Sequence, residues 1–256
     1  MSFIEIIILV FAGVMVGFIN VLAGGGSIIS LSVLMFMGLP VNLANGTNRI
    51  AILLQNVVAV SNFQRKKVLD LKKGKWLLIP AVIGSLFGAQ LANNLNEIIL
   101  ERSIAVVLIV ILFTMIYKPS KWLKEQEDLL VKKINVWQIL IFLFVGFYGG
   151  FIQAGVGFFL LTALVFSTGY ELVKANALKV FIILCYTPFS LLVFVIHGDV
   201  DWLYGVILAI GTMAGAFLAS KFAIEKGAKF VRWIVIIVIL VTILKLFGII
   251  NINLFD

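Results

Sequence analysis

Two groups of residues near the start of the chain could bind an anion. The first is the glycine block of the segment "NVLAGGGSIIS", in which Gly24, Gly25 and Gly26 precede Ser27. Each glycine is about 1 kcal/mol less favourable than alanine inside a helix, so we expect the helix to break there. A break frees backbone N–H groups, and helix N-termini favour anions. We therefore expect these four residues to form part of an anion site.

The second group is the polar cluster "ANGTNR", which supplies Asn45, Thr47, Asn48 and Arg49. It opens a mostly apolar segment, where an ionisable side chain is expensive and usually marks a binding site or a pathway. A guanidinium also has the planar geometry that binds an oxyanion through two parallel hydrogen bonds. The alternative is that the side chain extends to the nearest lipid headgroups. For Arg49 we favour the anion site.

The elements that position these groups are apolar helices. The chain has 256 residues, of which 62% are hydrophobic and 12% charged, whereas soluble domains carry roughly 25% charged residues. Apolar runs such as "WLLIPAVIGSLFGAQLA" approach or exceed the ~18 residues that indicate a membrane span. The sequence therefore predicts an all-α integral membrane protein that lies in a lipid bilayer.

The positive charges predict its orientation. The formal net charge is +8, and most cations lie in three short segments, "QRKKVLDLKKGK", "KPSKWLKEQEDLLVKK" and "KFAIEKGAKFVR". Short loops rich in lysine and arginine stay in the cytoplasm, so this charge requires no nucleic-acid partner. With these three segments inside, both termini are predicted outside, and the first apolar segment is predicted to be a retained span.

Three sequence blocks recur in the same order. "GFINVLAGGGS" aligns with "GFIQAGVGFFL", "LANGTNRIAILLQN" with "KANALKVFIILCYT", and "IGSLFGAQLA" with "IGTMAGAFLA". We therefore predict a first transmembrane repeat at 1–117, a charged cytoplasmic linker at 118–133 and a second repeat at 134–256. The G-x-x-x-G pairs in the last block, Gly84/Gly88 and Gly211/Gly215, are assigned to helix packing.

The charge pattern predicts that the two repeats are inverted. Each repeat is expected to hold an interrupted helix hairpin and three transmembrane helices, which gives 8–10 membrane segments in all. The hairpins occupy 3–38 and 135–169, and their short arms are too short for a full span. The predicted spans are 43–64, 76–93 and 99–117, then 174–197, 202–220 and 230–250. Inverted repeats with interrupted helices are typical of secondary transporters.

The repeat alignment extends the candidate site into the second half. Gln153 aligns with Asn20, Asn176 with Asn45 and Lys179 with Asn48. For Lys179, near the predicted inner surface, extension to the lipid headgroups is an open alternative. The second glycine-containing block adds Gly155 and Gly157 to the predicted substrate-binding residues, although close helix packing explains these two about equally well. The predicted pathway residues are Asn20, Gln55, Asn56 and Tyr186, although hydrogen bonding between helices explains the last three equally well.

Three segments carry a resemblance to a known family. "GFINVLAGGGSIISL", the "LANGTNR" that follows "GLP", and "GFYGGFIQAGVGFFLL" resemble the TauE/SafE family of membrane proteins, the sulfite-exporter type. The resemblance covers nearly the whole chain. It implies export of a small sulfur-containing anion, sulfite or an organosulfonate, across a prokaryotic plasma membrane. Ser30 and Ser32 stand where a proline commonly follows the glycine block in that family.

Other functions are less well supported. No cluster of His, Asp or Glu has metal-ligand spacing, no cofactor motif is present, and no convincing catalytic partner exists for His197, so we expect neither a metal site nor an enzyme. No acidic residue falls in the middle of a predicted span, so a buried proton relay has no candidate. The alternatives are an importer or channel for another small anion, or a membrane assembly subunit that transports nothing. The sequence leaves the oligomeric state open.

Overall fold

The computed structural model describes residues 1–71, 74–92 and 134–246, together with a few residues between 109 and 129. Across these ranges the chain forms eight helices and no strand, which confirms the predicted all-helical class. Most of the predicted span 99–117 and of the charged linker 118–133 lies outside the described residues. In chain order the helices are α1 (Phe3–Leu22), α2 (Gly26–Phe36), α3 (Val41–Arg65), α4 (Gly74–Gln90), α8 (Val136–Phe151), α9 (Val156–Thr168), α10 (Leu172–Ile196) and α11 (Trp202–Leu246).

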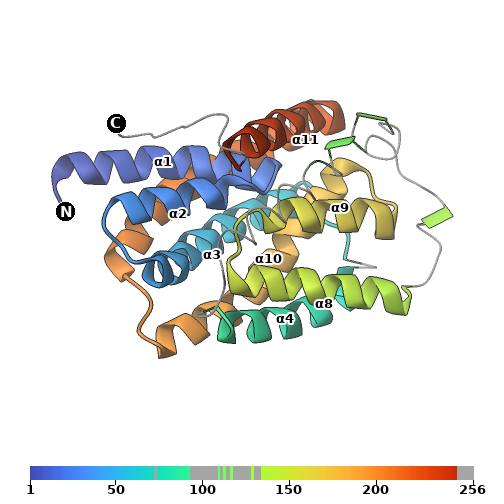
Figure 1. The fold of residues 1–256 in the computed structure, drawn as a ribbon. Coiled ribbons are helices and arrows are strands. Elements are labelled where there is room, and N and C mark those ends of the chain that lie inside the picture. The colour runs from blue at the N-terminus through green and yellow to red at the C-terminus, as the bar shows by residue number, and fades with distance from the viewer. Residues whose placement is uncertain are drawn as a thin grey trace.

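Two helix hairpins, α1–α2 and α8–α9, point toward each other with their tips in the middle of the molecule (Figure 1). Each hairpin begins with a capping box. In this motif the side chain of the residue before the helix accepts a hydrogen bond from the backbone N–H of the third helical residue. The side chain of that third residue accepts a hydrogen bond from the backbone N–H of the residue before the helix. Ser2 and Glu5 form the box at the start of α1, and Asn135 and Gln138 form it at the start of α8. The long arms therefore have well-defined beginnings.

The hairpins break where the glycines predict. α1 ends at Leu22 and α2 begins at Gly26. In the second hairpin α8 ends at Phe151 and α9 begins at Val156. Gly24 and Gly155 at these breaks have positive φ angles of 96° and 72°, a region of backbone space that glycine occupies without steric cost.

Between the hairpins lie α3 and α10, each 25 residues long. They run antiparallel, because the start of α3 contacts the end of α10. The Thr47 hydroxyl accepts the backbone N–H of Asp201, which follows α10, at 2.8 Å. Near the opposite end, a methyl placed on Gly74 at the start of α4 would meet the side chain of Leu178 in the first turns of α10. The two long polar segments of the sequence thus cross the molecule in opposite directions.

The fourth helix of each half packs on the hairpin of the other half. α11 contacts α1 more extensively than any other element, and α4 contacts α8 in the same way. These helices approach each other closely because glycines of one helix lie against the backbone of the other. A methyl added to Gly17 would lie 2.1 Å from the Thr212 carbonyl oxygen, and one added to Gly150 would lie 1.9 Å from that of Ser85. The glycine pairs Gly84/Gly88 and Gly211/Gly215 lie in these same contacts, which confirms their assignment to packing.

The outer surface is apolar. Three described helices are long and apolar enough to cross a bilayer, namely Phe3–Leu22, Leu172–Ile196 and the Trp202–Glu225 part of α11. α3 has the length, but its polar residues lower its hydropathy. Large side chains such as Phe11 on α1, Phe144 on α8 and Phe189 on α10 are exposed. Apolar surface of this extent is suited to lipid.

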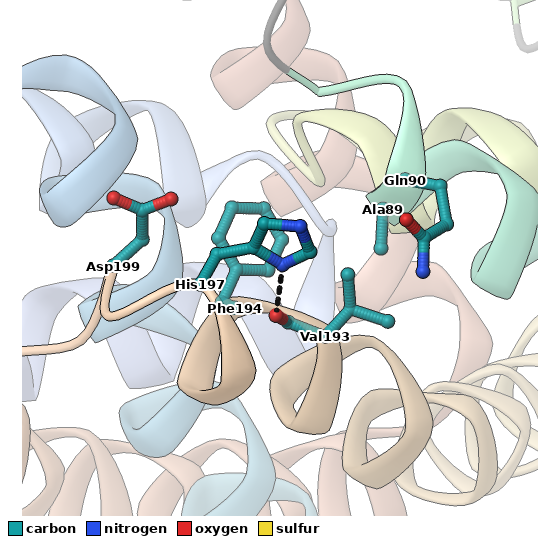
Figure 2. A pocket seen from close by; sticks show the side chains of 6 residues that line it. All are labelled: Ala89, Gln90, Val193, Phe194, His197 and Asp199. Carbon is teal, nitrogen blue, oxygen red and sulfur yellow. Dashed lines mark hydrogen bonds between the residues drawn. The ribbon is translucent and has the colours of Figure 1, made fainter.

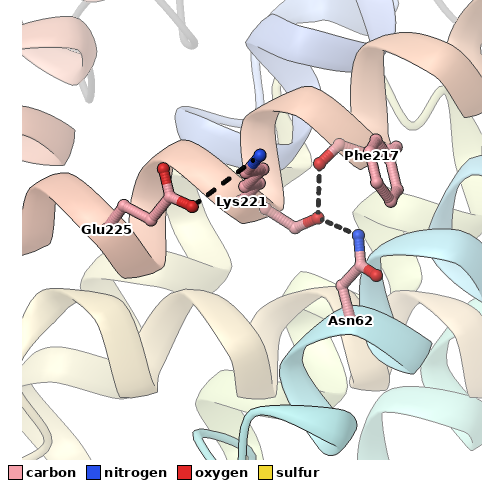
Figure 3. A network of polar contacts seen from close by, with 5 residues as sticks. Asn62, Phe217, Lys221 and Glu225 are labelled. Atoms are coloured by element: carbon pink, nitrogen blue, oxygen red, sulfur yellow. Dashed lines mark hydrogen bonds and ion pairs between the residues drawn. The ribbon is translucent and has the colours of Figure 1, made fainter.

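One predicted boundary is wrong. The segment "KFAIEKGAKFVR" was expected to be a loop between spans 202–220 and 230–250, but α11 continues through it to Leu246 as a single helix of 45 residues. The segment contains no proline and is rich in good helix formers. Lys221 and Glu225 form an i, i+4 ion pair at 3.9 Å along the exposed face (Figure 3), which favours helix. At 1.5 Å per residue α11 is about 68 Å long, over twice the bilayer core.

Just before this segment, α11 binds α3. The Asn62 side chain donates to the Ser220 hydroxyl at 2.8 Å, and that hydroxyl donates to the Phe217 carbonyl at 3.0 Å (Figure 3). Both polar side chains find partners at the helix contact. This network therefore joins α3 to α11, and its residues are not part of the candidate site described below.

Candidate functional site

Arg49 lies wholly buried on α3 and binds the end of α8. Its Nη2 donates to the Gly150 carbonyl at 2.6 Å, and its Nη1 donates to the Gly149 carbonyl at 3.2 Å and to the Ser190 hydroxyl at 2.9 Å. The last carbonyls of a helix have no partner within it and carry a partial negative charge. Arg49 therefore caps the broken C-terminus of α8.

Asn45 reinforces the same cap from one turn earlier on α3. Its Nδ2 donates to the Phe151 carbonyl at 2.8 Å, and its Oδ1 accepts from Arg49 Nη2 at 3.4 Å. The i, i+4 spacing of these two residues places both side chains on one helix face. We call Arg49, Asn45, Ser190 and the carbonyls of residues 149–151 the Arg49 centre.

Lys179 makes the equivalent contact with the other hairpin. It is wholly buried on α10, and its Nζ donates to the Asn20 carbonyl at 3.0 Å and to the Val21 carbonyl at 2.9 Å. These carbonyls are the end of α1. We call Lys179 and the two carbonyls the Lys179 centre. Each broken long arm is thus capped by a cation from the other half of the chain.

The two hairpin tips meet at Gly24 and Gly157. A methyl placed on Gly24 would lie 2.3 Å from the Gly157 Cα, and the converse distance is also 2.3 Å. No side chain larger than hydrogen fits between them. These two glycines align in the repeat, so equivalent points of the two hairpins touch. α2 and α9 both begin beside this contact, so their positive N-terminal ends converge there.

Asn20 links the Lys179 centre to the start of α2. Its Oδ1 accepts the Ser27 backbone N–H at 2.9 Å and the Ser27 hydroxyl at 3.2 Å. One turn further along α2, the Ser30 hydroxyl donates to Asn48 Oδ1 on α3 at 2.7 Å. Residues from the glycine block and from the "ANGTNR" cluster are therefore joined through hydrogen bonds.

Several buried polar atoms around this crossing have no hydrogen-bond partner, whereas buried polar groups in proteins are nearly always paired. Of nine such atoms, five are N–H donors, one is a hydroxyl and three are carbonyl oxygens. They belong to seven residues, all selected in the sequence analysis: Asn20, Asn48, Arg49 (through Nε), Gln55, Gln153, Asn176 and Tyr186. The excess of donors suits a ligand that accepts hydrogen bonds.

Gln153 is the most unusual member of this set. Its φ angle is +64°, in a region that costs a non-glycine residue of order 1–3 kcal/mol. Its side chain is 1% exposed. The amide interacts with the Tyr186 hydroxyl, and neither amide atom has any other hydrogen-bond partner. Neighbouring Tyr148 donates its hydroxyl to the Ala154 carbonyl, which fixes the break. Strained residues that persist in this way cluster at functional sites.

Three predicted residues occupy other places. Thr47 holds the α10–α11 loop through the Asp201 contact described above. Asn56 donates to the Ile52 carbonyl of its own helix at 2.8 Å. Gly155 is the left-handed residue before α9, and a methyl placed on it would make ordinary van der Waals contact with Phe158 and Ile28. Their local contacts explain them without a ligand.

The site also contains two residues that sequence reasoning missed. Ser190 contacts Arg49 directly, and the ring of Phe194 lies over the Arg49 guanidinium, with its centroid 4.4 Å from Cζ. Asn176, Lys179, Tyr186, Ser190 and Phe194 follow one another at spacings of three, four or seven residues, so they share one face of α10. That stripe was the signal that could have found both.

The electrostatics of the crossing are one-sided. Among the residues whose burial the structure describes, Arg49 and Lys179 are buried charges and no Asp or Glu is buried. Within the described residues no group of acidic, His or Cys side chains could hold a metal ion. Isolated charges are expensive to bury. The helix ends that they cap compensate only part of this cost.

These features define a helical membrane protein with two interrupted hairpins and buried cations at their crossing. Comparison with known proteins agrees. The chain matches the family model described as Sulfite exporter TauE/SafE over residues 9–246, and it therefore belongs to the TauE/SafE family of membrane transporters, as the sequence segments indicated. No solved structure matches the chain.

Curated relatives carry general names. A "Probable membrane transporter protein" of Haemophilus influenzae is 27% identical over 230 residues, which cover 90% of this chain and 89% of the relative. The "Probable membrane transporter protein YfcA" of Escherichia coli K12 is 28% identical, with 93% and 88% covered. "Probable membrane transporter protein YunE" of Bacillus subtilis is 26% identical, with 91% and 94% covered. These names specify transport and leave substrate and direction open.

Proposed function

We propose that this protein exports a small sulfur-containing oxyanion, sulfite or an organosulfonate, across a prokaryotic plasma membrane. The observation that carries the proposal is the pair of buried cations, Arg49 and Lys179, at a crossing with no buried carboxylate among the described residues. An anion at the crossing would compensate their charge, and the unpaired donors around it would bind its oxygens. The family description, Sulfite exporter, supports the choice of anion.

The charge distribution explains why the crossing favours an anion although the cations already have partners. The terminal nitrogens of Arg49 and the Nζ of Lys179 neutralise the negative C-terminal ends of α8 and α1. The positive N-terminal ends of α2 and α9 are left facing the contact of Gly24 with Gly157. Interrupted membrane helices bind anionic substrates with such N-terminal ends in secondary transporters. The first-turn N–H groups, Gln153 and Asn176 would contact the substrate, and the two cations would set the potential.

Transport follows if the two hairpins, one from each of the inverted repeats 1–117 and 134–256, rock against each other about this crossing. α4 moves with the α8–α9 hairpin and α11 with the α1–α2 hairpin, since each is locked there by glycine contacts. With the basic linker 118–133 inside, the N-terminus lies outside, and the continuous α11 removes the returning span that would have carried the C-terminus to the same side. Export of an anion requires no coupled ion, because a potential of 100 mV, negative inside, contributes about 2.3 kcal/mol per charge expelled.

The test is sulfite flux in proteoliposomes under an imposed potassium diffusion potential. The wild type is compared with Arg49→Gln and with Arg65→Gln, a matched control at the exposed end of the same helix. We expect flux toward the positive side in the wild type and the control, and a loss of at least about tenfold, or 1.4 kcal/mol, in Arg49→Gln.

Three outcomes separate the alternatives. Sulfite flux that ignores the potential would remove electrogenic export and favour electroneutral transport coupled to another ion. Conduction of chloride at channel rates would favour a channel. If the folded wild type moved neither sulfite, organosulfonates nor sulfate, the substrate class would be wrong, and an assembly subunit would become the better account.

A further inference from the structure

A surface pocket lies directly above the Arg49 centre. It is lined by Ala89 and Gln90 at the end of α4, by Val193, Phe194 and His197 at the end of α10, and by Asp199 in the following loop (Figure 2). Its room of about 10 Å³ is enough for roughly one water molecule. The pocket is therefore shallow, and the residue at its bottom determines whether it can connect to the interior of the protein.

Phe194 forms that floor. Its side chain is 3% exposed and lines the pocket on one side, while its ring covers the Arg49 guanidinium on the other. Ser190, one turn before Phe194 and wholly buried, donates to the Thr187 carbonyl and accepts from Arg49. A single aromatic ring thus separates the pocket from the buried cation. Ala89 and Val193 complete an apolar cluster around it.

The remaining wall of the pocket is held in place. The His197 ring contacts the Val193 carbonyl through Nδ1 at 2.7 Å (Figure 2), and the Asp199 carbonyl lies against Gly46, where a methyl would come within 1.9 Å. The Asp201 N–H is bound by Thr47. Since the backbone on both sides is fixed in this way, rotation of the Phe194 side chain is the smallest movement that would join the pocket to Arg49.

We infer that Phe194 is the barrier of the anion path on the α10 C-terminal side, and that the pocket in Figure 2 is the mouth of that path. The inference rests on the proposed function, because it assigns a barrier to the site of that function. The electron-rich face of the ring stabilises the guanidinium in the closed state. The same face repels an anion, so the ring must leave Arg49 before the anion reaches it.

Thiol accessibility tests this directly and independently of transport. Cys185, the single cysteine, is replaced by alanine, and Ser190→Cys places a reporter beneath Phe194. The detergent-purified protein is treated with a small anionic reagent, 2-sulfonatoethyl methanethiosulfonate, and the labelling rate is followed by mass spectrometry. His197→Cys, at an exposed position, reports the rate without a barrier.

The barrier is removed with Phe194→Ala, and the matched control is Phe189→Ala, which removes an exposed phenylalanine from the same helix. We expect Phe194→Ala to raise labelling at position 190 by at least about tenfold, toward the rate at position 197, and Phe189→Ala to leave it unchanged. Phe194→Leu, which keeps an apolar side chain in the cluster, provides an intermediate rate if the alanine variant does not fold.

Equal labelling of the reporter with phenylalanine, leucine or alanine at position 194 would overturn the inference. Increased labelling with Phe194→Ala, together with no transport of any anion by the wild type, would uphold the barrier and reject the proposed function. Sulfite flux by the wild type with unchanged labelling in Phe194→Ala would uphold the proposed function and reject the barrier. The two claims therefore fail separately.

Discussion

Arg49 and Lys179, one from each half of the chain, cap the broken long helices of the opposite halves. Arg49 donates to the carbonyls that end α8, and Lys179 donates to those that end α1. The exchange ties each polar helix to the other hairpin, so a shift of one half changes the surroundings of both cations. The proposed binding site at the crossing would thereby be linked to the arrangement of both hairpins.

The Lys179 centre should be essential for anion transport. Lys179→Met keeps the length of the side chain but removes the charge and leaves the Asn20 and Val21 carbonyls without their donor. We expect sulfite flux to fall at least about tenfold, which corresponds to 1.4 kcal/mol. The control is Lys221→Met, at an exposed position on α11. Unchanged flux in folded Lys179→Met protein would show that the buried charge is dispensable.

The contact of the hairpin tips should tolerate no side chain. Gly24→Ala would bring a methyl within 2.3 Å of Gly157 Cα at a φ of +96°, whereas Gly38→Ala meets a similar φ of +90° with open space around it. Both variants carry the left-handed backbone cost of about 1–2 kcal/mol, but only the first also separates the hairpins.

Thermal unfolding in detergent distinguishes the two variants. We expect Gly24→Ala to lower the free energy of unfolding by roughly 1–3 kcal/mol more than Gly38→Ala does, because of overpacking. The midpoint temperature of Gly24→Ala should therefore lie clearly below that of Gly38→Ala. Similar midpoints for both alanine variants would mean that the hairpin tips are not in close contact.

Gln153 should lower the stability of the protein and contribute to transport. Gln153→Gly relieves the positive φ of +64° and removes a buried amide whose only partner is the Tyr186 hydroxyl, so we expect a midpoint of unfolding about 2–4 °C higher. It also removes predicted substrate donors, so flux should fall roughly tenfold. Lys67→Gly is the control, because Lys67 has a φ of +57° at an exposed position. There the midpoint should rise with no loss of flux. Full flux in Gln153→Gly would exclude Gln153 from the site.

Much of this architecture could be predicted from local sequence. Glycine blocks predicted where α1 and α8 end, because glycine is unfavourable inside a helix at any position. The G-x-x-x-G pairs predicted close packing for a similarly local reason. The cation caps could not be predicted, since each depends on which helix end a side chain meets across the molecule. Arg49 was interpreted as a direct oxyanion ligand, whereas its two terminal nitrogens bind carbonyls.

Two other features show where sequence patterns were insufficient. The basic segment within α11 has the charge of a cytoplasmic loop, but its residues favour helix, and helix is what forms. Phe194 is one of 22 phenylalanines in the chain, and nothing in its immediate neighbours distinguishes it. Its position over Arg49 emerges only from the packing of α10 against α3.

The central claim is that an oxyanion binds where the two hairpins cross, and isothermal titration calorimetry tests it most directly. Sulfite is titrated into the detergent-purified protein, with chloride as the competing anion and with Arg49→Gln and Arg65→Gln as the paired variants. We predict saturable binding in the wild type and in Arg65→Gln, weakened at least about tenfold, or 1.4 kcal/mol, in Arg49→Gln. Equal affinities for sulfite in all three proteins would contradict the claim.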